Sequence, residues 1–368
     1  KSGVMEEERQ YLVYGKTNAS GAIEIAGWER KGISPQIANK IYDEMIDFAK
    51  YAFNKSHAAC YAVLAYQTQY LKTFYPQEFM SALMTSVMGN TDKIVIYIKE
   101  CEEIGIRVLP PDVNSSYKKF KVEDQNIRFA LTAIKNVGGS AVESIIKERE
   151  SYGEYTSVQN FIKRMGDKDI NKRLVESLIK AGAFDSLSPN RATLLGNLER
   201  IWDSMNAEKK KNIDGQVSLF DTGSSQGGEA MHMMEIAEFD RKTKLSLEKD
   251  VLGVYISGHP LSEYSQELKK IVTHTTMNFR EMEENYEIFQ YEDNKAVTFG
   301  GIISDKNYKS TKNNDQMVFL NLEDEYGSVE VIVFPRVLDK VKSKLSKDSI
   351  VIINGRMQIK EDDKIKLV

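Results

Sequence analysis

The residues of this sequence best suited to chemistry stand together at Phe53–Ala58 (FNKSHA), directly before an apolar stretch predicted to be helical. Lysine, serine and histidine at the N-terminus of a helix can bind an anion, because the helix dipole and the first N–H groups both favour negative charge. The alternative is a Ser or Asn cap with solvated neighbours, and side-chain chemistry alone favours it. The candidate anion contacts are Asn54, Lys55, Ser56 and His57.

A second candidate is a tight turn inside residues 133–149, which we predict to be a helix, a hairpin and another helix. Asn and Gly tolerate the positive φ of such a turn. A hairpin of this kind points backbone N–H groups outward, so a phosphate can bind without any base being read. A glycine-rich turn buried in a helical bundle is the alternative. Residues 161–200 carry eight basic and five acidic residues and so favour phosphate binding; the predicted duplex contacts are Asn136, Val137, Gly138, Gly139, Lys172 and Arg173.

A third candidate lies in residues 207–231, a segment rich in Lys, Gly, Ser and Gln that is predicted to be a flexible linker. A Leu-Phe pair in a segment that cannot form a core usually docks onto a partner. The alternatives are chance, or the linker folding back on its own domain. The QxxLF pattern of Gln216, Leu219 and Phe220 resembles the peptide that bacterial replication proteins insert into the sliding clamp.

The elements that must position these residues are mostly helical as far as residue 294. Residues 33–52 have a helical apolar period with Ser34 as cap and Pro35 at the first position. Residues 58–88, interrupted at Pro76, are predicted to be helical and buried on several sides. Further helices are predicted at 92–104, 169–181, 190–204 and 237–254, with short extended segments at 106–114 and 120–131.

Residues 295–368 alternate with period two and predict strands instead. Five strands with one helix, 335–345, between the third and fourth is the order of an OB barrel. The predicted fold class is therefore multidomain α+β, with helical and helix-hairpin-helix regions followed by an all-β OB-fold barrel. Phe319 alternates with Met317, so it is either a base-stacking residue or core. The predicted single-strand contacts are Lys306, Tyr308, Lys309 and Lys312, in the loop before the second strand.

Composition limits the remaining possibilities. The chain has 368 residues, a net charge of −4, 28% charged and 41% hydrophobic residues, as soluble globular proteins do. Two cysteines give no disulfide framework, and four scattered histidines give no zinc site. Asp112 and Asn114 do not form a carboxylate pair, because the second residue is an amide. We therefore predict no metal site and no catalytic residues in this chain. No run of 18 apolar residues and no signal peptide occurs, so we expect a cytoplasmic protein without membrane contact. Both ends look cut, and we expect a piece of a longer protein.

Several longer motifs resemble the alpha subunit of bacterial DNA polymerase III, the C-family replicative polymerase. They occur in family order over essentially the whole chain, at residues 51–61, 66–68, 75–80, 109–114, 137–138, 179–185, 216–220 and 252–261. One departure is Asn136, where the wider hairpin pattern commonly has Gly.

The resemblance implies an order of parts. Residues 1–115 would be the later part of the fingers, 116–206 a helix-hairpin-helix module, 207–231 the linker with its clamp-binding peptide, 232–294 a helical connector and 295–368 the OB domain. The resemblance also places the segment 54–57 beside the incoming triphosphate or primer end.

The resemblance further implies partners and chemistry. The partners would be primer–template duplex, single-stranded template, sliding clamp, other holoenzyme subunits and deoxynucleoside triphosphates. The family's two Mg²⁺ ions belong to a palm domain that this chain lacks. The parent would be a DNA-directed DNA polymerase, and this segment alone should bind no cofactor and be inactive. The alternative is a non-enzymatic DNA- and clamp-binding adaptor, which has no use for a nucleotide-facing segment such as Phe53–His57.

Overall fold

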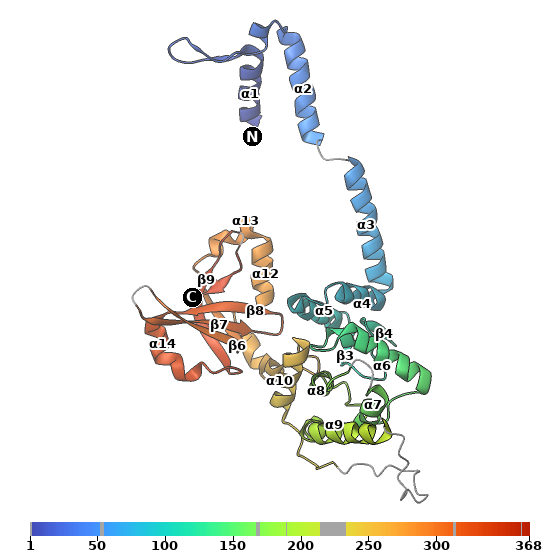
Figure 1. The fold of residues 1–368 in the computed structure, drawn as a ribbon. Helices are drawn as coiled ribbons and strands as arrows, with labels where there is room; N and C mark the ends of the chain where they lie inside the picture. Colours follow the sequence, from blue (N-terminus) through green and yellow to red (C-terminus); the bar gives the residue numbers. More distant parts are fainter. Residues whose placement is uncertain are drawn as a thin grey trace, which may run out of the picture. The chain divides into compact units, whose positions relative to one another are not determined.

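The structure, a computed structural model, describes residues 2–51, 55–166, 170–188, 190–213, 233–311, 314–361 and 363–368. It divides into two units, residues 1–74 and 75–368, which are described separately. Figure 1 shows the elements of each unit. Among the described residues, no helix has the length and apolar content needed to cross a bilayer.

The first unit is built from helices and a small hairpin. Its elements are α1 (Ser2–Tyr14), β1 (Lys16–Thr17), β2 (Ile23–Ile25), η1 (Glu29–Lys31), α2 (Pro35–Tyr51) and α3 (Lys55–Phe74). The predicted start of α2 is confirmed, since Pro35 is its first residue and Ser34 Oγ accepts from the N–H of Ile37 at 3.4 Å. The ends of the hairpin approach closely at Gly15 and Gly27, which have φ values of +83° and +62°.

Helix α3 differs from expectation. Side chains along it are exposed, among them Tyr66 (70%) and Phe74 (63%), so the prediction that this stretch is buried on several sides is wrong for α3 in this structure. The second half of the stretch, α4 (Pro76–Ser86), behaves as predicted, because Met80 and Met84 are fully buried in the core of the second unit. The break between the helices falls at Tyr75, directly before Pro76, as proline geometry requires.

The second unit opens with α4, α5 (Thr91–Glu103) and a small sheet. The sheet has the order β3 (Val108–Leu109), β5 (Asn126–Arg128), β4 (Lys121–Glu123), with β3 parallel to β5. The side chain of Asn90 caps α5 by accepting from the N–H of Lys93 at 3.1 Å. This part packs into one core with the helices that follow. The region 1–115, which was expected to be one part, is therefore divided at residue 75 between the two units.

The helix-hairpin-helix region is asymmetric. Its first predicted helix is reduced to one 3₁₀ turn, η2 (Leu131–Ala133), because the preceding chain is tied into the sheet, where the N–H of Phe129 donates to Leu109 O at 3.1 Å. The later helices are α6 (Gly139–Tyr152), α7 (Val158–Met165), α8 (Lys172–Lys180), α9 (Arg191–Ile213) and α10 (Arg241–Leu252). Helix α9 continues past residue 207, where the linker was predicted to begin. The clamp-peptide residues Gln216, Leu219 and Phe220 lie outside the described residues.

The chain then reaches the barrel through short helices. These are η3 (Pro260–Tyr264), α11 (Ser265–Ile271), α12 (Thr276–Glu284), α13 (Tyr286–Phe289) and η4 (Gln290–Glu292). The barrel strands are β6 (Ala296–Ser310), β7 (Gln316–Glu323), β8 (Ser328–Val333), β9 (Ile350–Gln358) and β10 (Lys366–Leu367), with α14 (Pro335–Val341) and η5 (Lys342–Lys344) between β8 and β9.

The barrel closes in the order β10-β8-β7-β6-β9, with β8 and β10 parallel, which confirms the predicted OB topology. The three valines of β8, Val329, Val331 and Val333, point inward as the alternation predicted. The helical region and the barrel have separate apolar cores. The first contains residues from α4 to α9 and 251–254, and the second contains residues 279–367.

Candidate nucleic-acid interface

The hairpin before α6 turns at one residue with a left-handed backbone. Asn136 has a φ of +66°, so the Asn that replaces the more common Gly adopts the conformation the turn needs. Its side-chain amide donates to Ser177 Oγ on α8 at 3.0 Å. Val137 is buried, which fixes the hairpin to the core. The structure thus joins the hairpin to α8, the helix that carries the predicted basic residues Lys172 and Arg173.

The N-terminus of α6 is open to a ligand on the side of Gly138 and Gly139. Gly138 is the N-cap residue and provides no side-chain hydrogen bond to the first turn. A Cβ on Gly139 would lie 3.4 Å from Lys118 Cε, so a lysine stands beside this helix end. Lys118 also pairs with Glu143 on α6. Sequence analysis missed Lys118 because it lies 21 residues before Gly139, and only the pair Lys118-Lys119 could have drawn attention to it.

The basic residues of α7 to α9 divide into two groups. Arg164 and Arg191 are structural, since their guanidinium groups bond to backbone carbonyls at 2.8–3.1 Å and to neighbouring carboxylates. Lys172 Nζ lies 2.8 Å from Glu199 Oε1, and this hydrogen bond raises the lysine pKa. Arg173 is exposed and has no ion pair among the described residues. Arg173 is therefore available to a phosphate, as are Lys163 and Arg200, which are also exposed and have no ion pair among the described residues.

Arg191 connects α9 with α10 and with the turn after α8. Its guanidinium bonds to Asp185 at 2.7 Å and to Glu248 of α10 at 3.1 Å. Glu248 in turn accepts from the N–H of Ser257 at 3.1 Å. Gly182 has a φ of +79°, and a Cβ there would lie 2.2 Å from Arg191 Nη2. The motif at 181–185 therefore needs glycine both for backbone geometry and for the space that the guanidinium occupies.

The predicted single-strand residues of the barrel lie on a strand. Strand β6 continues to Ser310, so the prediction that Lys306, Tyr308 and Lys309 lie in a loop is wrong: the hairpin with β7 extends beyond the barrel. By strand alternation, Lys306 and Tyr308 share one face and Lys309 lies on the other. Lys306 Nζ donates to Leu345 O at 2.8 Å, and Lys312 lies outside the described residues.

On the outer face of this hairpin, Lys309 meets an aromatic ring. Its Nζ lies 4.5 Å from the centroid of Phe319, within the range of a cation–π contact. The inward face of β7 is filled by Val318, Leu320 and Leu322, so Phe319 is not part of the barrel core. A ring and a cation on an outer strand face form a small platform of the type that stacks single-stranded bases.

Three further predictions concern the candidate anion contacts at residues 54–57, the residue Asp112, and the absence of a metal site. Lys55 begins α3, Ser56 and His57 are exposed, and the His57 ring packs 4.4 Å from the Tyr61 ring; Asn54 lies outside the described residues. The carboxylate of Asp112 accepts from two backbone N–H groups of its own turn, at 2.7 and 2.9 Å. No group of three His, Cys, Asp or Glu side chains in the described ranges is arranged to hold a metal ion.

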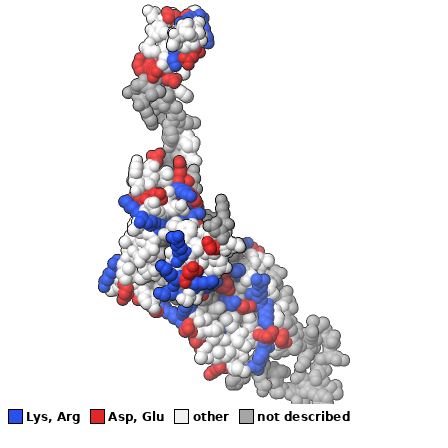
Figure 2. Space-filling model, turned by 90° about the vertical axis from the view of Figure 1, so that its left-hand side faces the viewer, with Lys and Arg blue, Asp and Glu red and all other residues white. Residues whose placement is uncertain are grey.

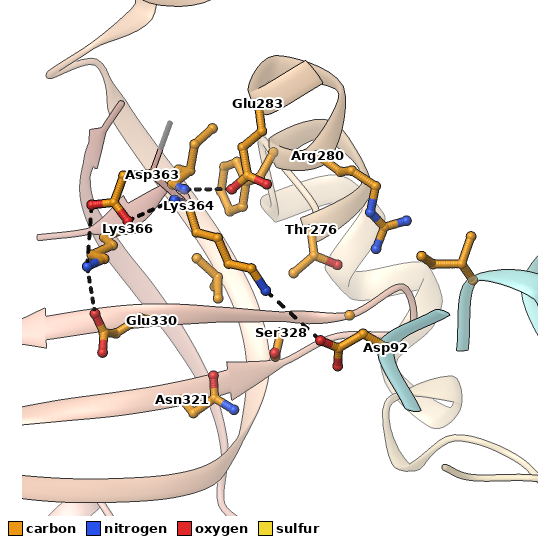
Figure 3. Close-up of a pocket in the computed structure, with 15 residues that line it drawn as sticks. Asp92, Thr276, Arg280, Glu283, Asn321, Ser328, Glu330, Asp363, Lys364 and Lys366 are labelled. Carbon is orange, nitrogen blue, oxygen red and sulfur yellow. Dashed lines mark hydrogen bonds and ion pairs between the residues drawn. The ribbon is translucent and has the colours of Figure 1, made fainter. Parts of the chain in front are cut away.

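Charge over the molecule is mixed. Figure 2 shows Lys and Arg side chains interspersed with Asp and Glu over the viewed face. The cavity in Figure 3, about 420 Å³ between α5, α12 and the barrel, follows the same pattern. Two of its three cations form ion pairs at the rim, Lys364 with Asp92 at 4.0 Å and Lys366 with Glu330 at 3.4 Å, while Arg280 donates to Tyr326 O at 3.3 Å. The viewed face and this cavity therefore both carry charges of mixed sign.

Comparisons with known proteins agree with this geometry. Residues 105–194 match the family described as a helix-hairpin-helix motif, and residues 297–368 match the OB-fold nucleic acid binding domain family.

The chain is also similar, over nearly its whole length, to proteins named DNA polymerase III subunit alpha. It is 38% identical to that of Borreliella burgdorferi over 93% of this chain, 36% identical to that of Thermus aquaticus over 92%, and 34% identical to that of Vibrio cholerae over 92%. It spans only 27–29% of the length of these relatives.

Proposed function

This chain belongs to the family of bacterial DNA polymerase III alpha subunits, and on that premise we propose that it serves template-directed DNA synthesis as part of such a polymerase. Its own task in this proposal is to hold duplex DNA through the phosphate backbone, with the hairpin at Asn136–Gly139 as the principal contact. Because the chain spans under a third of its relatives, the activity of the whole enzyme is part of the proposal.

One observation carries the proposal of duplex grip. The α6 N-terminus has no side-chain cap, the Asn136 turn directly precedes it, and Lys118, which pairs with Glu143, lies beside Gly139. N–H groups at a helix end bind a phosphate oxygen without distinguishing bases, and a nearby lysine adds charge. Binding should therefore be independent of sequence and should weaken steeply as salt rises.

The test places a carboxylate at the phosphate position. Ser140→Glu puts a negative charge in the first turn of α6, where it favours the helix but repels phosphate. We expect the full chain with this change to keep its stability and to lose duplex affinity by about tenfold or more in fluorescence anisotropy. The matched control is Ser151→Glu, the same change at the exposed far end of α6. Equal affinity of both variants and the unaltered chain would contradict the proposal.

We also propose that Asn54, Lys55, Ser56 and His57 face the triphosphate or primer end in the intact polymerase. A lysine and a histidine can stabilise the negative charge that accumulates there. In the intact enzyme, Lys55→Ala should slow nucleotide incorporation while the protein remains folded. A normal steady-state rate and a normal Michaelis constant for this variant would mean that the cluster is only a helix cap. Residues 1–368 alone should show no polymerase activity.

A third proposed task is tethering to the sliding clamp through Gln216, Leu219 and Phe220. In this proposal the two apolar side chains enter a cleft on the clamp while the glutamine bonds at its rim. Each buried anchor contributes on the order of 2–3 kcal/mol. Leu219→Ala/Phe220→Ala should lower clamp affinity at least about a hundredfold by titration calorimetry. Ser218→Ala is the control within the same peptide, and equal affinity of the double variant would exclude this role.

A further inference from the structure

The junction between the helical region and the barrel carries a cluster of charges. The two apolar cores on either side do not share residues. A cavity of about 170 Å³ lies between them, lined by α5, by residues 254–262 and by the turn from β7 to β8. Two ion pairs cross this junction beside the cavity, Lys249–Glu323 and Lys99–Glu325. A third, Lys364–Asp92, is mostly exposed and spans 4.0 Å.

The acidic residues are presented rigidly by the barrel. Asp324, between the two glutamates, accepts from the N–H groups of Thr276, Tyr326 and Gly327 at 2.7, 2.8 and 3.0 Å. Burial raises its pKa in spite of these bonds. The turn is therefore fixed to α12 and to its own strands, and Glu323 and Glu325 project from a stiff support toward the helical region.

The lysines come from two helices of the other core. Lys249 of α10 bonds to Glu323, which is 8% exposed, and its Nζ lies 5.1 Å from the Tyr255 ring centroid. Lys99 of α5 lies 3.6 Å from Glu325 and 2.9 Å from Glu102 of its own helix. Its pKa is raised: burial lowers it, but the bond to Glu102 and the charge of Glu325 outweigh this.

A neutral histidine stands among these charges. His259 lies on the cavity wall, where its Nδ1 accepts from the N–H of Leu261 at 3.2 Å. Burial lowers its pKa to about 4, and the charges of Lys99 and Lys249 contribute. The groups facing it are Lys99 and Glu102 from α5, Lys249 and Tyr255 from the α10 side, and Glu323, Asp324 and Glu325 from the barrel turn. Protonation of His259 would add a buried cation beside two lysines.

We propose that these residues form an electrostatic latch: the glutamates of the β7–β8 turn, seated on Lys249 and Lys99, hold the barrel against the helical region and release it when the ion pairs are broken. A competing polyanion or high salt would open the latch by way of Lys99–Glu325, whose side chains are 25% and 26% exposed, and would act less on the more buried Lys249–Glu323 pair. The barrel then moves as a body while both cores stay folded.

The test measures the distance between the two bodies in the full chain. Spin labels are attached at Tyr152→Cys on α6 and Asp339→Cys on α14, both exposed, in a Cys60→Ser background. Cys101 stays unlabelled, because it is buried and burial raises its pKa to about 12. We expect one narrow distance distribution at about 0.1 M salt and a broad one at about 1 M, where the Debye length falls from about 10 Å to about 3 Å.

Charge reversal separates the latch from a general salt effect. Glu323→Lys should give the broad distribution already at low salt, and the swap Lys249→Glu/Glu323→Lys should restore the narrow one. The matched control is Glu330→Lys, which breaks the Lys366 pair inside the barrel at 3.4 Å and should leave the distribution narrow. A narrow distribution in Glu323→Lys, or no rescue by the swap in a protein with native circular dichroism, would overturn the proposal.

Discussion

At the scale of single residues, some basic residues of the stretch 161–200 are buried in ion pairs and stabilise the fold, whereas others are exposed and can bind a ligand. Arg191 is 2% exposed and neutralised by Asp185 and Glu248, whereas Arg173 is exposed without an ion pair among the described residues. The sequence contains both within one basic stretch and does not distinguish them. Burial and ion pairing do distinguish them, and they leave only some of the basic residues of 161–200 free to contact an external phosphate.

This division predicts unequal effects of two neighbouring substitutions. Arg173→Ala should weaken duplex binding and reduce the slope of log affinity against log salt by about one, as loss of one phosphate contact does. Lys172→Ala should have the smaller effect, because Glu199 already holds its ammonium group. Fluorescence anisotropy at several salt concentrations measures both, and a larger loss for Lys172→Ala would contradict the assignment.

Gly182 gives a second prediction at this scale, with an internal control. Gly182 and Gly105 both have a φ of +79°, but a Cβ meets Arg191 at Gly182 and nothing within 4 Å at Gly105. Gly105→Ala should cost about 1 kcal/mol of unfolding free energy from backbone strain alone. Gly182→Ala should cost about 3 kcal/mol more, because it displaces a buried guanidinium from its carboxylates. Urea denaturation tests this, and equal midpoints would mean that the guanidinium can shift without loss.

At the scale of elements, the barrel hairpin formed by β6 and β7 gives the third prediction. Phe319→Ala should lower affinity for a labelled single strand, since base stacking on an aromatic ring contributes about 1–3 kcal/mol per base. Val318→Ala, the neighbouring inward residue, should instead lower stability, because Val318 belongs to the barrel core. Anisotropy and thermal unfolding of the full chain distinguish the two. Unchanged single-strand binding in Phe319→Ala would make the platform purely structural.

Local patterns predicted the regular elements well. The OB order followed from period-two alternation, and the start of α2 followed from Ser34 and Pro35. The patterns failed where tertiary contacts decide the outcome. The first helix of the hairpin shrank to η2 because its chain pairs with the β3 segment, and β6 continued through residues that look like a polar loop because β7 pairs with them.

Of the candidate site, only the residues that are close together in the sequence could be predicted. Asn136 and Gly138 lie within one turn, and their spacing reveals a hairpin. Lys118 and Ser177 reach the same place through 20 to 40 intervening residues, and a single sequence contains no signal for that distance. The ion pair between Lys172 and Glu199 could not be predicted from the sequence for the same reason.

At the scale of the whole molecule, His259 predicts a dependence on pH. Its pKa is lowered to about 4 in the folded chain from 6.5, so folding favours the neutral form. Its stabilising contribution is present above pH 6.5 and is lost as pH falls toward 4, by about 1.4 kcal/mol per pH unit in that window. His259→Asn should flatten the profile of thermal stability between pH 7 and 5.

The chain order of the Arg191 cluster has a consequence for synthesis on the ribosome. The guanidinium is held by Glu248, which follows it by 57 residues, and the N–H of Lys135 bonds to Val251 O at 2.8 Å. A nascent chain emerges from its N-terminus, so the helical core stays open until α10 has left the exit tunnel. Ribosome-bound chains stalled at residue 225, with α9 still inside the exit tunnel, should thus be cleaved by protease within α6 to α8, whereas chains stalled well beyond residue 254 should resist.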